Sequence, residues 1–269
     1  MAAAVATGVA LAAVVLISFD LGTVAAMVVV TVVALLASAE MFAAFRRAGY
    51  QPATLLGLVA AAALMVATYT KGQAALPLVT AMVVGFTFLW FLVGVERGAD
   101  PVGGSAATLL VYCWVGVFGS FAALLLAPSL FPDRHGIAFL LGGLLTGVAF
   151  DVGGLLVGSW IGRHPLAPTV SPHKTWEGVI GGAVVALLVA VVVVRAVHPW
   201  TMPKAVALAL VVSVVSPIGD LSESLVKRHL GLKDMGRILP GHGGILDRVD
   251  GLLFVLPATY YLVKAVHLG

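Results

Sequence analysis

Charged side chains of both signs gather in one stretch of this 269-residue chain, from Asp220 to Asp250. The stretch leaves one apolar segment at Lys227 and enters the next at Ile245. Carboxylates can hold divalent cations through oxygen ligands, and cationic side chains can neutralise phosphates. Because the rest of the chain is largely apolar, we expect the chemistry here. The groups concerned are Asp220, Glu223, Asp247 and Asp250, with Lys227, Arg228, Lys233, Arg237 and Arg248.

A polar stripe opens this stretch. Its members stand at positions i, i+3, i+4, i+7 and i+8, which is one face of a helix. Two carboxylates, a hydroxyl and two cations would be costly against lipid, so the face should line a cavity in the protein. The stripe consists of Asp220, Glu223, Ser224, Lys227 and Arg228.

Two further carboxylates begin the last apolar segment. Asp247 and Asp250 are three residues apart, with Arg248 between them, so they occupy neighbouring positions on one helix face. Together with Asp220 from the preceding segment, they form an oxygen-rich set from two helices. Such a set is suited to a hard divalent cation.

The connection between these segments reads GLKDMGRILPGHGG. One proline and three glycines disfavour a helix in this connection: Pro240, Gly241, Gly243 and Gly244. Backbone N–H groups that are not used in a helix can then approach an anion. With the neighbouring cations, this composition suits a polyphosphate, although no GxxxxGK[ST] loop occurs. We expect His242, which stands between glycines, to take part in binding.

A second polar cluster lies upstream in RHPLAPTVSPHKTWEGVIGG. Ser171, Lys174 and Thr175 place hydroxyls and a cation there, and Thr175 is also suited to cap a helix that begins near Trp176. Asp151 lies deep in the preceding apolar run. Because an unpaired buried carboxylate is costly, we expect Asp151 to meet a cation or a metal ion.

The composition identifies an all-α, polytopic integral membrane protein. Hydrophobic residues make up 61% of the chain and charged residues 10%. Continuous apolar runs of about 20 residues suit helices that cross a bilayer, whereas a β-barrel would need short alternating segments. Cys113 lies in such a run and is expected to be a buried thiol. We predict about nine transmembrane helices, near 2–19, 22–44, 53–70, 74–94, 104–127, 137–161, 178–197, 204–226 and 245–265.

The distribution of basic residues predicts the orientation. Of the 15 Lys and Arg residues, ten fall on one side of the predicted spans and five on the other. The positive-inside rule then places the N-terminus and the loops 163–177 and 227–244 in the cytoplasm. Residues 1–130 carry almost no intramembrane charge. We assign them to N-terminal helices that serve as scaffold, lipid-facing or dimer surface, and residues 131–269 to a catalytic domain.

Residues 224–250 resemble the signature of phosphatidate cytidylyltransferases, also called CDP-diacylglycerol synthases. The matching pattern is a serine, KR, KD four residues later, a small residue, proline, HGG and DR-hydrophobic-D. Upstream, SPHKTWEG and GDLSES resemble the SPxKTWEG and GDLxES segments of that family. The likeness covers residues 148–254, with Val152 as a departure where a hydroxyl residue is expected after Asp151.

The resemblance implies an enzyme that joins CTP to phosphatidic acid and releases pyrophosphate and CDP-diacylglycerol for phospholipid biosynthesis. The catalytic residues it implies are Asp220, Lys227, Asp247 and Asp250. The implied Mg²⁺ ligands are Asp220, Asp247, Asp250 and Asp151, and K⁺ is considered as a second cation. The substrate-binding residues it implies are Ser171, Lys174, Thr175, Ser224, Arg228, Lys233, His242, Gly243, Gly244 and Arg248.

The expected mechanism is in-line attack of a phosphatidate oxygen on the α-phosphorus of CTP. Because that phosphate is already ionised, positioning and charge neutralisation should matter more than a strong base. The expected partners are CTP, phosphatidic acid and membrane lipids. The resemblance also implies a homodimer, and we expect no nucleic acid. The expected location is a bacterial-type plasma (inner) membrane, with the active site facing the cytoplasm.

Three other functions are considered. A CDP-alcohol phosphotransferase would need a DGxxAR…GxxxDxxxD pattern, which the sequence lacks. A cation-coupled transporter could use Asp151, Asp220 and Asp247, but the charges gather near one membrane face and include a glycine-rich cationic loop. A specialised cytidylyltransferase for an ether or isoprenoid lipid stays open, because the apolar half does not reveal acyl preference.

Overall fold

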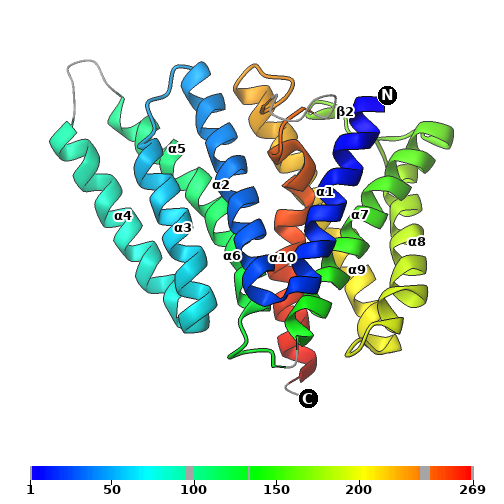
Figure 1. Ribbon diagram of the computed structural model, residues 1–269. Coiled ribbons are helices and arrows are strands. Elements are labelled where there is room, and N and C mark those ends of the chain that lie inside the picture. Colours follow the sequence, from blue (N-terminus) through cyan, green and yellow to red (C-terminus); the bar gives the residue numbers. More distant parts are fainter. Residues whose placement is uncertain (1, 95–99, 133, 237–242, 268–269) are drawn as a thin grey trace. The chain divides into compact units, whose positions relative to one another are not determined.

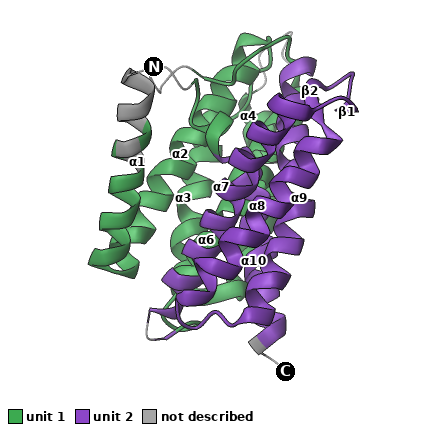
Figure 2. Ribbon diagram, turned by 90° about the vertical axis from the view of Figure 1, so that its right-hand side faces the viewer, with its two compact units in different colours: residues 1–131, 230–248 green, residues 132–229, 249–269 purple. Residues whose placement is uncertain are grey.

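The computed structural model describes residues 2–94, 100–132, 134–236 and 243–267, mostly as helices (Figure 1). Arg237 and His242 of the glycine-rich loop lie outside the described residues. The chain divides into two compact units (Figure 2). Unit 1 comprises residues 1–131 and 230–248, and unit 2 comprises residues 132–229 and 249–269. The segment that carries Lys233 and Asp247 is therefore grouped with the N-terminal helices.

Unit 1 begins with four apolar helices: α1 (Ala2–Leu21), α2 (Thr23–Arg47), α3 (Thr54–Lys71) and α4 (Ala75–Gly94). Between α3 and α4 the chain turns at Gly72, whose φ of +69° favours glycine. Figure 1 shows α3 and α4 as an antiparallel pair. An apolar cluster joins them, with Ala60 and Leu64 from α3, Val83 from α4, and Tyr112 from the helical run that follows.

The predicted span at 104–127 is one continuous helical run in three parts: α5 (Pro101–Val111), a π-helical turn (Tyr112–Val117) and α6 (Phe118–Leu126). Its start follows capping rules, because Pro101 occupies the first turn and Asp100 accepts a hydrogen bond from Gly103 N–H at 2.9 Å. Cys113 lies in the π-helical turn and is exposed, so the expectation of a buried thiol was wrong.

Unit 2 contains helices α7 (His135–Ile161), α8 (Trp176–Val192) and α9 (Met202–His229), and most of α10 (Leu246–His267). Between α7 and α8 lies a small antiparallel hairpin, β1 (Pro165–Ala167) and β2 (Ser171–Thr175). We had expected only a polar loop at 163–177, so this hairpin is a local exception to an otherwise helical chain.

Glycines bring α7 and α8 into close contact. A Cβ atom on Gly182 would lie 2.6 Å from the backbone oxygen of Phe150, and one on Gly178 would lie 2.9 Å from that of Gly154. Small residues allow such backbone approach where lipid gives helices little hydrophobic drive to associate. The start of α8 is thereby held against α7, and the hairpin that precedes α8 is held with it.

Seven described helical stretches are long and apolar enough to cross a membrane. One of them, 54–94, contains both α3 and α4. In α1, the apolar stretch that could be assessed is Ala12–Leu21, which is shorter than a membrane span. The structure therefore supports a polytopic helical membrane protein. The count of nine spans and the cytoplasmic N-terminus stay predictions.

Candidate active site

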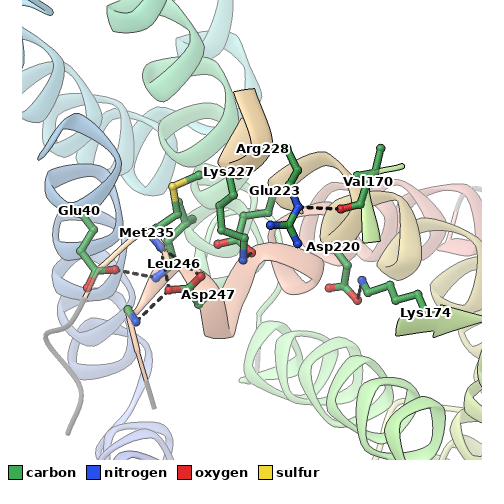
Figure 3. A network of polar contacts seen from close by, with 11 residues as sticks. Glu40, Val170, Lys174, Asp220, Glu223, Lys227, Arg228, Met235, Leu246 and Asp247 are labelled. Atoms are coloured by element: carbon green, nitrogen blue, oxygen red, sulfur yellow. Dashed lines mark hydrogen bonds and ion pairs between the residues drawn. The ribbon is translucent and has the colours of Figure 1, made fainter. Parts of the chain in front are cut away.

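The polar centre of unit 2 joins β2 to α9. Lys174 Nζ donates to Asp220 Oδ2 at 2.5 Å, and Figure 3 shows the two side chains pointing toward each other. Both are partly buried, with 31% of the Lys174 side chain and 21% of the Asp220 side chain exposed. Water and salt therefore screen the attraction within this pair less than they screen a surface ion pair. The sequence placed both residues on one side of the membrane, and the structure brings them into contact.

Asp151 of α7 and Asp250 of α10 belong to the same centre. Asp151, Asp220 and Asp250 interact electrostatically with one another, and Lys174 offsets part of their charge. Ser216 Oγ of α9 donates to Asp151 Oδ1 at 3.1 Å. We expected Asp151 to meet a cation or a metal ion, and that expectation stays a prediction; the positive charge of Lys174 acts on Asp151 without a described hydrogen bond between them.

Helices α9 and α10 approach closely beside these carboxylates. A Cβ atom on Gly251 would lie 2.9 Å from Asp220 Oδ1 and 2.8 Å from Ser216 Oγ. On the facing helix, a Cβ atom on Gly219 would lie 2.6 Å from the Asp250 backbone oxygen. Glycine at both positions therefore lets Asp220 lie against α10.

A cavity of about 750 Å³ opens on this centre. Asp151, Lys174 and Asp220 line it, together with the hydroxyl residues Ser171 and Thr175. Its wall also includes glycines of α7 and α8 and the apolar side chains of Phe150, Leu155, Leu166 and Val179. The outer surface nearby is apolar, since Leu155 is 72% and Trp160 86% exposed. A cavity with charged and apolar walls suits an amphipathic ligand.

Contacts of two further residues, Thr175 and Glu177, hold the hairpin. Thr175 Oγ1 accepts from Gly178 N–H at 3.2 Å and caps α8, which confirms the predicted helix start at Trp176. Glu177 accepts from the backbone N–H groups of Arg163 and His164, at 3.1 and 3.2 Å, and pairs with the His164 ring at 2.5 Å. These contacts fix the start of α8, directly after Lys174, against the residues that precede β1.

The predicted polar stripe lies entirely within α9. Lys227 Nζ donates to Glu223 Oε2 at 2.6 Å, and the Glu223 side chain is 2% exposed. Glu223 also interacts with Asp250. Arg228 Nε donates to the Val170 backbone oxygen at 3.3 Å, between the ends of β1 and β2. Lys227 and Arg228, both expected to act on phosphate, thus also make contacts within the protein.

Asp247, in unit 1, organises the backbone around it. Its carboxylate accepts from Met235 N–H at 3.2 Å and from Gly244 N–H at 2.9 Å (Figure 3). Gly243 has a φ of +80°, which favours glycine. Glu40 of α2 accepts from Leu246 N–H at 2.9 Å at the start of α10. The loop is therefore anchored at Met235, before residues 237–242, and at Gly244 and Leu246, after them.

The remaining predicted site residues have fewer described contacts. Lys233 and Arg248 are exposed, and Ser224 is half-buried. The sequence analysis gave Glu223 no catalytic, metal-binding or substrate-binding role, and it did not single out Glu40. Glu223 lies in the polar stripe, so its position was a usable signal. Glu40 is a carboxylate within an apolar helix, which is a signal for function.

Mg²⁺ binds through oxygen ligands, which carboxylates supply. Within the part of the chain that the structure describes, no three His, Cys, Asp or Glu side chains form a group that could hold a metal ion. Mg²⁺ commonly uses one or two protein carboxylates and takes its other ligands from substrate phosphates and water. Asp151 and Asp220, which line the cavity, fit that requirement by their chemistry. The four-carboxylate set stays a prediction.

Fold and cavity together define a polytopic helical membrane protein with a charged cavity that opens beside an apolar surface. Comparison with known proteins is more specific. The model of the cytidylyltransferase family matches residues 2–266, and the chain belongs to that family.

Several relatives carry the name phosphatidate cytidylyltransferase. The protein of Mycobacterium bovis is 32% identical over 237 residues, which cover 84% of this chain and 76% of that protein. The Mycobacterium leprae protein is 41% identical over 152 residues, 55% of this chain and 46% of its own length. The Brucella abortus protein is 52% identical over 112 residues, 40% of each. The last two alignments thus span less than half of the relatives they match.

Proposed function

We propose that this protein is a phosphatidate cytidylyltransferase, which transfers the cytidylyl group of CTP to phosphatidic acid. Membership of the cytidylyltransferase family and the names of the relatives support the reaction class. The observation that carries the proposal is the cavity of about 750 Å³ in which Lys174 and Asp220 meet beside Asp151. Its charged wall suits phosphate groups, and its apolar wall suits the start of an acyl chain.

Lys174 positions and neutralises phosphate in this scheme. Its ammonium group is held by Asp220 and reaches the cavity from β2, where Ser171 and Thr175 add hydroxyl donors. Arg228 holds the far end of the hairpin through Val170 and so keeps these donors in place. We assign Ser171, Lys174 and Thr175 to the phosphatidate headgroup.

The reaction forms one P–O bond and breaks another. An oxygen of the phosphatidate phosphate attacks the α-phosphorus of CTP, and the bond from that phosphorus to the oxygen bridging the α- and β-phosphates breaks. Pyrophosphate leaves with the bonding electrons, and CDP-diacylglycerol remains. Because the attacking phosphate is ionised at neutral pH, no strong base is required, and fixed positive charge and orientation lower the barrier.

Mg²⁺ is the proposed cofactor, with Asp151 and Asp220 as its protein ligands in the cavity. Bound there, it would neutralise the negative charge of the CTP phosphates. Asp250 adds negative charge beside Asp220 and favours a cation at this place. The assignment of Asp247 as a further ligand, and of Lys233, His242 and Arg248 to CTP, rests on the sequence resemblance.

The remaining proposals concern the setting of the enzyme. An excess of basic residues on the predicted inner side supports a cytoplasmic hairpin and loop in a bacterial-type inner membrane. A cytoplasmic site would have direct access to CTP. The homodimer is carried over from the family resemblance alone, and a second cation, K⁺, is a separate proposal without a described site.

The test is product formation by purified protein in detergent–lipid micelles, with labelled CTP, phosphatidic acid and Mg²⁺. We expect labelled CDP-diacylglycerol from the wild type and none from Asp247→Asn. A folded protein that binds CTP but uses no phosphatidate would have another lipid acceptor, so an ether lipid and an isoprenoid phosphate are assayed in parallel. Absence of both CTP binding and product would reject the enzyme. Cation flux in liposomes would then be measured.

A further inference from the structure

Beyond the residues assigned so far, we infer that Glu40 and Arg47 of α2 are positioning residues for Asp247 and for the loop that leads into its helix, α10. The inference rests on the proposed function, because the resemblance assigns this loop and Asp247 to the reaction. It gives the N-terminal helices a part in the chemistry, whereas the sequence suggested only scaffold or surface for them.

Glu40 fixes the start of α10. Its side chain is buried, with 4% of the residue exposed, and Oε2 accepts the N–H of Leu246 at 2.9 Å. Leu246 is the first residue of α10, where backbone N–H groups lack partners within the helix. A carboxylate at that end also interacts favourably with the helix dipole. Asp247 is the next residue, so Glu40 determines where its backbone begins.

Arg47 holds the other end of the described loop. It lies two helical turns after Glu40 on α2, and its Nη2 donates to the Met235 backbone oxygen at 2.5 Å. The N–H of the same residue, Met235, donates to the Asp247 carboxylate at 3.2 Å. One peptide segment is thus bound by Arg47 on its carbonyl side and by Asp247 on its amide side. Movement of Arg47 would be passed directly to Asp247.

Two glycines of the loop have the space that Glu40 requires. A Cβ atom on Gly236 would lie 2.2 Å from Glu40 Oε1. A Cβ atom on Gly244 would lie 2.7 Å from Glu40 Oε2 and 2.8 Å from Asp247 Oδ2. Gly236 and Gly244, which lie on either side of the undescribed residues 237–242, therefore both approach the Glu40 carboxylate. The absence of a side chain at these two positions leaves room for the Glu40 carboxylate, in addition to any role of the glycines in binding phosphate.

The arrangement holds two carboxylates near each other. Glu40 and Asp247 both lie beside Gly244. Together the two carboxylates accept hydrogen bonds from the backbone N–H groups of Met235, Gly244 and Leu246. Loss of Glu40 would leave the Leu246 N–H without this partner and remove one of the groups that set the direction of Asp247.

The test uses Glu40→Ala, Glu40→Gln and the matched control Ser38→Ala. Ser38 is a buried polar residue of the same helix, and its hydroxyl makes no hydrogen bond within the described part of the chain. We expect Glu40→Ala to lower kcat about tenfold to hundredfold, the range expected for loss of a buried charged acceptor. The KM for phosphatidate should stay within about twofold. Glu40→Gln, which keeps an oxygen acceptor, should recover most of the activity, and Ser38→Ala should behave as wild type.

A double substitution tests the contact itself. Gly236→Ala should be as damaging as Glu40→Ala, because its methyl group collides with the carboxylate. In the double variant Glu40→Ala/Gly236→Ala the collision is gone, so the two losses should not add. Additive losses would show that Gly236 and Glu40 act separately and would overturn the proposal.

Hydrogen exchange separates this inference from the proposed function. Peptides that contain residues 243–247 should exchange faster in Glu40→Ala than in wild type or Ser38→Ala. If wild type makes no CDP-diacylglycerol, the proposed function fails, and the exchange result still decides whether Glu40 holds the loop. If wild type is active and Glu40→Ala shows unchanged exchange and unchanged kcat, the positioning role is rejected.

Discussion

Replacing Lys174 with methionine removes the ammonium group that donates to Asp220 Oδ2 at 2.5 Å. The cavity then loses a cation beside Asp151, Asp220 and Asp250, while the length and the apolar stem of the side chain are kept. The three carboxylates then lose the positive charge that Lys174 placed beside them. We expect phosphate groups to be repelled from the cavity as a result.

The size of the effect follows from the burial of the pair. A charge-assisted hydrogen bond contributes about 1.5–3 kcal/mol. The side chains are 31% and 21% exposed, so solvent screens the pair only in part. If the transition state depends on this cation, kcat/KM should fall roughly tenfold to hundredfold. Lys174→Arg keeps the charge and should retain more activity than Lys174→Met.

The assay is CDP-diacylglycerol formation with phosphatidate and CTP varied separately. The control is Lys71→Met, the same change at an exposed lysine at the end of α3. The double variant Lys174→Met/Asp220→Asn should regain thermal stability, because both charges of the pair are removed, without regaining activity. If Lys174→Met keeps kcat/KM within about threefold of wild type, the reasoning about this cation is refuted.

Three other predictions concern packing, the hairpin and the metal. Gly182→Val should separate α7 from α8 and reduce stability by about 1–3 kcal/mol in a thermal unfolding assay, whereas Gly85→Val, where nothing lies within 4 Å of the added Cβ, should not. Arg228→Met should release Val170 and raise the KM for phosphatidate about threefold to tenfold, with faster hydrogen exchange in the hairpin; unchanged exchange would contradict this. Chelation by EDTA should abolish product formation, and added Mg²⁺ should restore it; full activity in EDTA would remove Mg²⁺ from the account.

Much of the helical framework follows from hydrophobic run length. The apolar segment predicted at 204–226 is α9, and the one predicted at 245–265 is α10. The spacing of Asp220 to Arg228 is likewise confirmed as helical, and Thr175 caps α8 as its residue type suggests. These features depend on local periodicity and capping, which neighbouring residues determine.

The missed features depend on residues far apart in the chain. Glu40 and Leu246 are separated by 206 positions, and no local pattern joins them. The hairpin at 165–175 is short and rich in proline, so its pairing was not visible from alternation. Lys174 and Asp220 were assigned to the same side of the membrane, but their contact required the packing of β2 against α9. A single sequence supplies the candidates, and tertiary packing selects the pairs.

The most direct test of the account follows the two ends of the CTP triphosphate. CTP labelled at either the α- or the γ-phosphate is given to protein in micelles with phosphatidic acid, and lipid and water-soluble products are separated. The account predicts α-label in an extractable lipid and γ-label in pyrophosphate, in equal amounts, with both lost in Asp220→Asn. Transfer of γ-label to lipid would indicate a kinase. Equal activity of Asp220→Asn and wild type would place the reaction away from the Lys174–Asp220 cavity, and either result would contradict the account.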